Sequence, residues 1–263
     1  MSGVLWTFCY HDVEEFTSSD MLGSHYVKIS QIEEDLQVAS DAGLEVVTRC
    51  GDYLSLCAGG NELDRDKVLL TFDDGYSSQV ETLCKLGREK GVGAVVFVVV
   101  GSVGKRGYAS WSALRDLANE GYGVQSHGYS HSVLTSLDWG SLKEEMKRSR
   151  EELQERLGQV VWGLALPQGF YNTRVLLAAS EEGYRICFTS RYGTGIRYHT
   201  PSSTILVPRI VARDNRIQKA IIRLRKPGAF RHWYEIKGGC HDSLKNLVGY
   251  RVASVLWRLS HPE

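Results

Sequence analysis

Two adjacent carboxylates lie in the string Thr71-Phe72-Asp73-Asp74-Gly75-Tyr76. The apolar run Val68-Leu69-Leu70 precedes them and an amphipathic segment, residues 77–90, follows, which predicts a strand, a tight turn and a helix. The two acids then lie at the C-terminal end of a buried strand, where α/β folds collect their active sites. Because neighbouring carboxylates repel each other, the pair predicts a compensating cation, proton or ring of donors.

Two histidines spaced four residues apart supply candidate ligands for such a cation. His127 and His131 lie in the string Ser126-His127-Gly128-Tyr129-Ser130-His131, directly after a predicted strand over residues 123–126. They can meet one ion if the intervening turn curls like the start of a helix. With one aspartate they form a set of two neutral imidazoles and a carboxylate, which suits Zn²⁺ and also admits Co²⁺, Ni²⁺ or Fe²⁺. An HxxxH pair alone more often has no metal role, so the Asp pair at a second strand end carries the interpretation.

Strands and helices are predicted to alternate along most of the chain. Short apolar runs and amphipathic segments alternate six or seven times, which is typical of βα units with parallel strands. We therefore expect an α/β fold, a distorted (β/α) barrel of about seven parallel strands with helices outside. We assign residues 1–213 to this barrel and residues 214–263 to a C-terminal helical extension packed on it, within one domain overall. The predicted strands cover residues 4–10, 44–48, 68–70, 94–100, 123–126, 160–166, 185–189 and 205–207, and the predicted helices cover residues 29–42, 77–90, 110–120, 137–157 and 173–182.

Composition excludes several function classes. The chain has 263 residues, 43% of them hydrophobic and 24% charged, as in ordinary globular proteins. Lys plus Arg and Asp plus Glu both number 31, so the net charge of zero gives no case for a nucleic-acid partner. No apolar run approaches the length of a membrane span, and the N-terminus lacks the pattern of a signal peptide. The six scattered cysteines fit free thiols in a reducing compartment, so we expect a cytoplasmic location.

A basic amphipathic segment, residues 213–226, allows weak association with an anionic membrane surface. The alternative is a helix that packs its Ile and Leu face on the barrel, with its charges in solvent. A location peripheral to the inner face of the membrane follows only from the first interpretation.

The strings at residues 71–75 and 126–131 together resemble the first and second motifs of the polysaccharide deacetylase family, the NodB-homology domains. The opening string at residues 8–13 is similar to the first strand of many members, and residues 164–172 resemble a degraded third motif. The resemblance spans roughly Val4 to Arg213. It implies a distorted (β/α) barrel and metal-dependent hydrolysis of an N-acetyl group on a sugar.

The resemblance implies a role for each residue of these motifs. Asp74, His127 and His131 would bind the divalent metal, and Asp73 would be the general base. A cation in such a site lowers the pKa of bound water to about 7, and a facing carboxylate can accept the proton. A backbone N–H stabilises the developing oxyanion. In the family this donor comes from the third motif, which corresponds to Gln168 and its substrate-facing neighbours Gly169 and Tyr171.

The third motif lacks the family's arginine, which orients the base, because Ala165 and Leu166 precede Pro167. Arg209, in the string Val207-Pro208-Arg209-Ile210, is the candidate substitute, since a related subgroup has such a Pro-Arg-Ile string. The alternative for Arg209 is a surface salt bridge.

The chain also lacks the late Leu-x-His motif, whose histidine protonates the leaving amine, and the aspartates and tryptophan of the fourth motif. His11 is a candidate for this acid because a residue just past the first strand faces the barrel mouth. A structural histidine is the alternative. Further candidates, in contexts that the sequence does not place, are His199, His232 and His241.

We expect a metal-dependent hydrolase that removes an N-acyl (acetyl) group from an amino sugar or glycan precursor. Nucleotide- and lipid-linked precursors are both candidate substrates, and the expected setting is cell-surface polysaccharide or lipopolysaccharide biosynthesis. One alternative is a deformylase or another amide hydrolase that acts on a sugar. Another is a catalytically silent barrel that binds a glycan, which the missing arginine and late histidine motivate.

Overall fold

The computed structural model describes residues 3–14, 26–48, 63–195, 197–199, 202–213 and 216–224. The strands are β1 (Leu5–Tyr10), β2 (Asp12–Glu14), β3 (Tyr26–Lys28), β4 (Glu45–Val46), β5 (Lys67–Phe72), β6 (Ala94–Val98), β7 (Gly123–Ser126), β8 (Gly163–Ala165), β9 (Ile186–Phe188), β10 (Arg197–His199), β11 (Thr204–Val207) and β12 (Ile210–Val211). The helices are α1 (Ile29–Asp41), α3 (Ser77–Lys90), α4 (Trp111–Asn119), α5 (Trp139–Leu157), α6 (Thr173–Glu181) and α7 (Arg216–Leu224). Short 3₁₀ turns are η2 (Val100–Ser102), η3 (Leu134–Ser136) and η4 (Pro167–Gly169).

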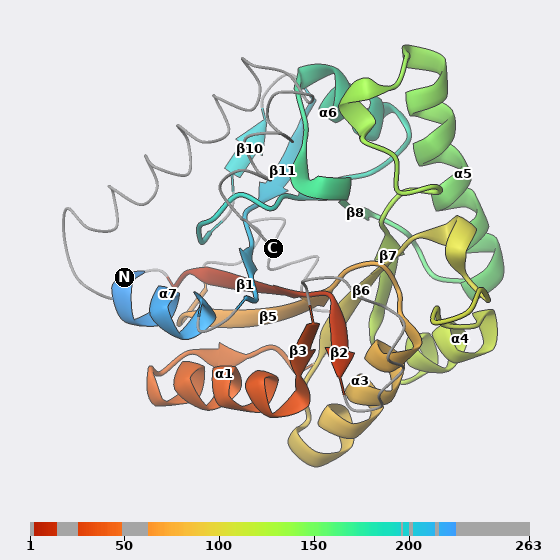
Figure 1. Ribbon diagram of the computed structural model, residues 1–263. Helices are drawn as coiled ribbons and strands as arrows, with labels where there is room; N and C mark the ends of the chain where they lie inside the picture. The colour runs from red at the N-terminus through yellow and green to blue at the C-terminus, as the bar shows by residue number, and fades with distance from the viewer. Residues whose placement is uncertain are drawn as a thin grey trace, which may run out of the picture.

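The main sheet curls into an open barrel with helices around its outside (Figure 1). Its strand order is β10-β11-β9-β8-β7-β6-β5-β1-β12, with β4 paired to β5. Every pair is parallel except β10 with β11. The predicted α/β class and (β/α) barrel are confirmed. The small β2–β3 sheet and strands β10 and β12 were not predicted.

One short segment carries the chain across the gap between the two edges of the sheet. Strand β11 pairs with β9, whereas β12, two residues later, pairs with β1 at the other edge. If β11 and β12 are counted as one interrupted strand, they join the parallel strands β1, β5, β6, β7, β8 and β9 of the main sheet. The total then matches the predicted number of about seven. Arg209 lies in the two-residue connection, so the crossing sets its position between the edges.

Capping residues mark where two of the helices begin or end. The Asp138 side chain accepts a hydrogen bond from Ser141 N at the start of α5. Helices α3 and α5 end at Gly91 and Gly158, which have φ of 65° and 66° in the left-handed region that glycine adopts freely.

Alternation along the strands separates two apolar layers. In β1, Trp6 and Phe8 pack outward beneath the helices, whereas Leu5 joins an inner cluster with Leu69 of β5. The inner cluster also contains Phe97 and other residues that fill the barrel interior. Two and four residues beyond Leu69, the same period places polar side chains on the inner face, above this apolar floor. The carboxyl ends of the strands thus bring polar groups together over a packed base.

Helix α7 is the described part of the predicted C-terminal extension. It contacts α1 and β12, and it buries Ile217, Ala220 and Ile221 while Ile222 is 60% exposed. The predicted extension beyond residue 224 lies outside the described residues. Among the helices that the structure describes, none combines the length and apolar character needed to cross a membrane.

A buried carboxyl links α1 to the end of β1. Asp35 accepts hydrogen bonds from Tyr10 Oη at 3.1 Å and from Gln31 Nε2 at 3.2 Å. Burial raises the pKa of Asp35 to about 6, although these hydrogen bonds oppose the rise. The folded protein therefore holds a proton that the unfolded chain releases, so this group's contribution to stability falls as pH rises from about 4 to about 6.

Asp35→Asn should remove this pH dependence, because the amide keeps an acceptor for Tyr10 and carries no charge. We expect the free energy of unfolding of the variant to exceed that of the native protein by about 1–2 kcal/mol at neutral pH, a figure reduced for partial solvent screening. The two proteins should converge in acid, below the pKa of the unfolded carboxyl. Urea unfolding at several pH values measures both quantities. Asp41→Asn, at an exposed carboxyl of the same helix, is the control, and an unchanged pH slope in Asp35→Asn would contradict the assignment.

Candidate active site

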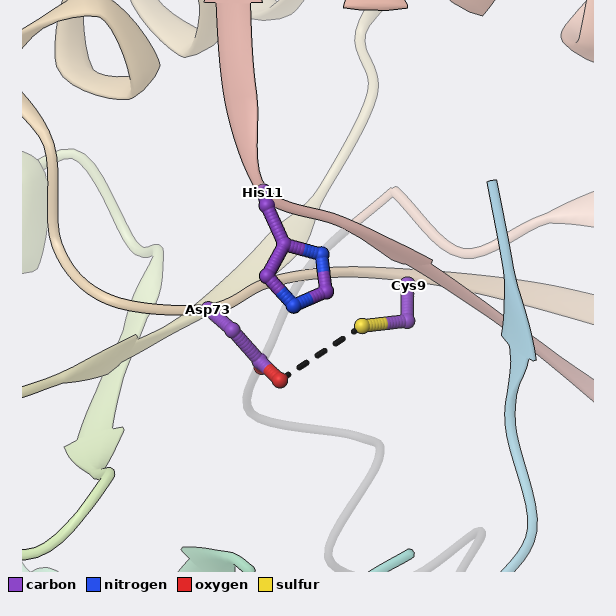
Figure 2. A group of neighbouring side chains, drawn as sticks. All are labelled: Cys9, His11 and Asp73. Carbon is purple, nitrogen blue, oxygen red and sulfur yellow. Dashed lines mark hydrogen bonds between the residues drawn. The ribbon is translucent and has the colours of Figure 1, made fainter. Parts of the chain in front are cut away.

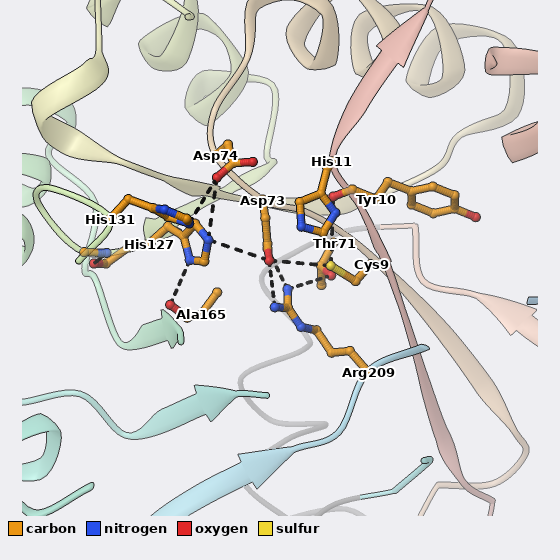
Figure 3. A network of polar contacts seen from close by, with 12 residues as sticks. Cys9, Tyr10, His11, Thr71, Asp73, Asp74, His127, His131, Ala165 and Arg209 are labelled. Atoms are coloured by element: carbon orange, nitrogen blue, oxygen red, sulfur yellow. Dashed lines mark hydrogen bonds and ion pairs between the residues drawn. The ribbon is translucent and has the colours of Figure 1, made fainter. Parts of the chain in front are cut away.

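Asp73 and Arg209 form a buried ion pair at the mouth of the barrel (Figure 3). Arg209 Nη1 donates to Asp73 Oδ1 at 2.6 Å and Nη2 donates to Oδ2 at 2.7 Å, so the pair is bidentate. Arg209 is 1% exposed and Asp73 is 2% exposed. The structure therefore excludes the surface salt bridge that was the alternative for Arg209.

The guanidinium is fixed from several sides. Arg209 Nε donates to Thr189 O at 3.2 Å, and Nη1 also donates to Thr71 Oγ1 at 3.3 Å. The ring of Phe97, at the top of the apolar floor, lies 5.6 Å from the guanidinium carbon. Burial alone would raise the pKa of Asp73, but the Arg209 guanidinium beside it outweighs burial and holds that pKa below its usual range. Asp73 is therefore an ionised carboxylate with a fixed orientation.

Asp74, His127 and His131 bring one ligand atom each to a common point (Figure 3). Asp74 Oδ1 lies 3.7 Å from His127 Nε2 and 3.6 Å from His131 Nε2. Two ligands of one Zn²⁺-sized ion lie roughly 3–3.5 Å apart, given metal–ligand distances of about 2.0–2.2 Å. Both histidine nitrogens thus lie close to the distance from Asp74 Oδ1 that a shared ion requires, and all three atoms lie within 4.8 Å of one another, so the residues fit a divalent cation.

The protonation of these residues also suits a cation. His127 Nδ1 lies 2.9 Å from Ala165 O, and as the donor of this hydrogen bond it leaves Nε2 free of a proton toward Asp74. Burial lowers the pKa of His127 to about 3, so the ring is neutral near pH 7. Burial, and then the charge of Asp73, raise the pKa of Asp74 to about 7. A positive ion at the common point would offset the burial of Asp74 and its repulsion by Asp73, and would keep Asp74 ionised.

The loop between the two histidines does not curl like the start of a helix, which corrects the expected geometry. Gly128 and His131 both have left-handed φ, 80° and 61°, and the two imidazole rings meet edge to face at 4.9 Å. Asp74 has φ of 78° and Gln168 has φ of 57°. Left-handed backbone costs a non-glycine residue about 1 kcal/mol or more and clusters at functional sites. Three of the four non-glycine residues with positive φ, among the described residues, are predicted site residues.

Figure 2 shows His11 beside Asp73 and Cys9, and Figure 3 shows that it lies on the side of Asp73 away from Asp74, His127 and His131. One ligand atom each of Cys9, His11 and Asp73 lies within 4.8 Å of the others. Cys9 donates from Sγ to Asp73 Oδ2 at 3.5 Å, and burial raises the pKa of this thiol well above its usual value. Because the thiol is protonated and Arg209 already occupies the carboxylate, this second group fits a proton network better than a cation.

The environment of His11 favours a neutral imidazole. Burial lowers its pKa, Asp73 opposes this, and Arg209 reinforces it. His11 follows β1 directly and lies near Asp73, so its role as the acid stays a prediction. Of the other candidate acids, His199 has a described backbone in β10, whereas His232 and His241 lie outside the described residues.

The string after β8 forms one wall of the mouth. Gln168 is exposed with a left-handed backbone, and Gly169 follows with φ of 71°. A Cβ on Gly169 would approach Ser190 Cβ to 2.7 Å, so the turn requires glycine at this position. Tyr171 is half-buried against the core instead of standing free in the mouth. Strand β8 positions both this string, which follows it, and the His127 ring, which bonds to the carbonyl of Ala165 at its end.

Two supporting residues were missed in the sequence. Thr71 Oγ1 donates to Phe8 O at 2.8 Å and accepts from Arg209, and its position two residues before Asp73 on a strand could have revealed it. Gln79, fully buried on α3, donates from Nε2 to His11 O at 2.7 Å and to Asp73 O at 2.5 Å. Gln79 thus joins the ends of β1 and β5, and only the folded chain shows this link.

The candidate site combines two histidines and one carboxylate with a second, ion-paired aspartate at the mouth of a (β/α) barrel. Metal-dependent hydrolases use groups of this kind. The model of the polysaccharide deacetylase family matches residues 60–187. Over this range, which contains both motifs, the chain is similar to the family, and the resemblance that the motifs predicted is confirmed.

Among curated relatives, the chain is 28% identical over 130 residues to the Bacillus subtilis (strain 168) protein named "Putative polysaccharide deacetylase YxkH", covering 49% of this chain and 47% of that protein. It is 26% identical over 153 residues to an uncharacterized 30.6 kDa protein of Geobacillus stearothermophilus, covering 57% of this chain and 55% of that one. The chain thus matches about half the length of these relatives.

Solved structures share the fold. The Streptococcus pyogenes deacetylase PplD in complex with acetate has a TM-score of 0.70 at 20% identity, over 86% of this chain and 100% of that one. IcaB from Ammonifex degensii has a TM-score of 0.70 at 22% identity, over 84% of this chain and 96% of that one.

Proposed function

We propose that this protein is a metal-dependent hydrolase that removes an N-acyl group, acetyl in the first instance, from an amino sugar or glycan precursor. The observation that carries the proposal is the pair of neighbouring aspartates, of which only Asp73 is neutralised by an arginine, although its Oδ2 also lies 3.9 Å from His127 Nε2. Asp74 faces His127 and His131, whereas Asp73 is held by Arg209. One carboxylate is thus available to a cation, and the other is withheld from it.

Asp74, His127 and His131 would hold the ion, with Zn²⁺ as the first candidate and Co²⁺, Ni²⁺ or Fe²⁺ as alternatives. When bound, such an ion supplies Lewis acidity and lowers the pKa of a water molecule toward 7. Asp73 receives the proton of the attacking water as general base. Its bidentate bond to Arg209 fixes the carboxylate and leaves lone pairs on both oxygens to accept that proton.

His11 is our proposed general acid for the leaving amine. Its ring is neutral in the free site, so it would first take the proton that the neighbouring Asp73 accepts from the water and then donate it to the amine, from the side of the site opposite His127 (Figure 3). The backbone N–H of Gln168 is the proposed donor to the oxyanion, with Gly169 and Tyr171 forming the wall beside it. Arg209 takes the role of the arginine that the third motif lacks.

The substrate class rests on the family and on the names of relatives, which include polysaccharide deacetylases. A precursor for cell-surface polysaccharide or lipopolysaccharide, nucleotide- or lipid-linked, is our first candidate, with action in the cytoplasm or at the inner face of the membrane. A formyl or other acyl group on the same sugar nitrogen is the alternative chemistry.

Removal of the ion tests the proposal. Purified protein should contain close to one divalent ion per chain, and it should release acetate and a free amine from N-acetylated amino-sugar oligomers. Chelation should abolish the release, and added Zn²⁺ or Co²⁺ should restore it. His127→Ala should bind no ion and show no release, because the deleted ring supplies one of three ligands. A silent glycan-binding barrel would instead show no ion and no release in the native protein.

A panel of N-formyl, N-acetyl and longer N-acyl amino sugars separates the alternative chemistries. We expect the acetyl compound to give the highest kcat/KM. A higher value for the formyl compound would replace deacetylation by deformylation without changing the assignment of the site.

A further inference from the structure

One carboxylate on helix α5 ties down the loop that carries both histidines. Glu145 Oε1 accepts hydrogen bonds from the backbone N–H of Tyr129 at 2.9 Å and of Ser130 at 2.6 Å. Glu145 Oε2 accepts from Ser130 Oγ at 2.9 Å. Hydrogen bonds to an ionised acceptor are about twice as strong as neutral ones, so three of them form a firm anchor.

The other peptide groups of this loop are held from the opposite side. Gly128 O accepts from Val100 N at 3.2 Å, and Tyr129 O accepts from Gly101 N at 2.8 Å. Gly101 also has no room for a side chain, because a Cβ would lie 2.8 Å from Tyr129 O. The loop is thus held between η2 and α5. On the α5 side, the N–H groups of Tyr129 and Ser130 both donate to Glu145.

The two histidines depend on this clamp to different degrees. The His127 side chain is 3% exposed, and its ring is fixed by Ala165 O. The His131 side chain is 37% exposed, and nothing comparable fixes its ring among the residues that the structure describes. His131 also holds a left-handed backbone, which needs support from its surroundings. Its Nε2 reaches Asp74 only if the preceding loop stays in place.

We infer that Glu145 is a positioning residue of the metal site, which presets the loop so that His131 meets Asp74 and His127 before an ion arrives. The inference rests on the proposed function, because it concerns the affinity of that site. Groups that orient metal ligands from outside the ligand shell typically change metal affinity by 10- to 100-fold. Glu145 acts on the ion through the loop and does not touch it.

Glu145→Ala should bind Co²⁺ about 10- to 100-fold more weakly than the native protein, as measured by calorimetric titration and by the visible absorption of the bound ion. Glu145→Gln keeps one oxygen that can accept from both N–H groups and loses the charge, so it should fall between the two. Glu144→Ala is the matched control, because Glu144 is an exposed glutamate on the same helix and should leave the affinity unchanged.

Amide hydrogen exchange of the metal-free protein gives a readout that does not need the ion. The Tyr129 and Ser130 amides should exchange faster in Glu145→Ala and at the native rate in Glu144→Ala. Native Co²⁺ affinity in Glu145→Ala would overturn the inference, as would a lowered Tm with unchanged affinity, which indicates a merely structural role. If the native protein itself binds no Co²⁺, the proposed function fails, and unchanged exchange at Tyr129 and Ser130 would overturn the hold of Glu145 on the loop separately.

Discussion

Asp73→Asn is expected to keep the metal ion and lose activity, whereas Asp74→Asn, the same change one residue later, is expected to lose the ion. A general base contributes typically 10²- to 10⁴-fold, so kcat of Asp73→Asn should fall by about that factor with little change in ion affinity. Asp74 Oδ1, the proposed ligand atom, lies 3.7 Å and 3.6 Å from Nε2 of His127 and His131, so an amide at this position should weaken ion binding directly. Rates of acetate release and ion content of both variants measure the contrast.

The neighbouring positions make each variant the control for the other. Both changes remove one negative charge from the same turn, so a general electrostatic effect would alter the two variants alike. Asp116→Asn, at an exposed aspartate of α4, reports any effect of amide substitution far from the site. Loss of the ion from Asp73→Asn, or a native rate in that variant, would remove the base from the proposal.

The division of labour between the two aspartates could be predicted only in part from the sequence. Alternation along β5 places Thr71 and Asp73 on the inner face, and the two motifs at strand ends predict that Asp74 and the histidines converge. The Asp74 side chain points away from Asp73 because the Asp74 backbone has a left-handed φ, and the amino-acid sequence does not reveal this conformation. The sequence likewise suggested a helical turn between His127 and His131, where the structure has a clamped loop.

Two residues show why the rest of the site needed the fold. Arg209 lies 136 positions after Asp73, and it reaches that carboxylate because the chain crosses from one sheet edge to the other between β11 and β12. No local pattern distinguishes such a crossing from an ordinary loop. Glu145 is one of several charged residues on α5, and in the sequence it cannot be told from Glu144. The rotation of α5 about its axis on the barrel decides which of the two glutamates faces the loop between His127 and His131.

Arg209→Met is expected to give the largest loss of stability of any single change at the site. It leaves a carboxylate that is 2% exposed without its cation, and breaking a buried ion pair from one side costs about 3–5 kcal/mol. The pKa of Asp73 should rise, because burial would then lack its main opposing charge. The remaining activity should therefore need a higher pH than that of the native protein. Urea unfolding and the pH profile of kcat/KM measure the two effects.

The double variant Asp73→Asn/Arg209→Met separates the pair from the packing around it. With the buried charge removed as well, part of the lost stability should return, whereas activity should not, so the two single changes should be strongly non-additive. Arg209→Lys should restore little, because one ammonium cannot reproduce two bonds of 2.6 Å and 2.7 Å from a planar fork. Arg185→Met, at an exposed arginine, should change neither property. Additive losses in the double variant would mean that Arg209 stabilises the barrel crossing itself, and that Asp73 owes its orientation to Gln79 and Cys9.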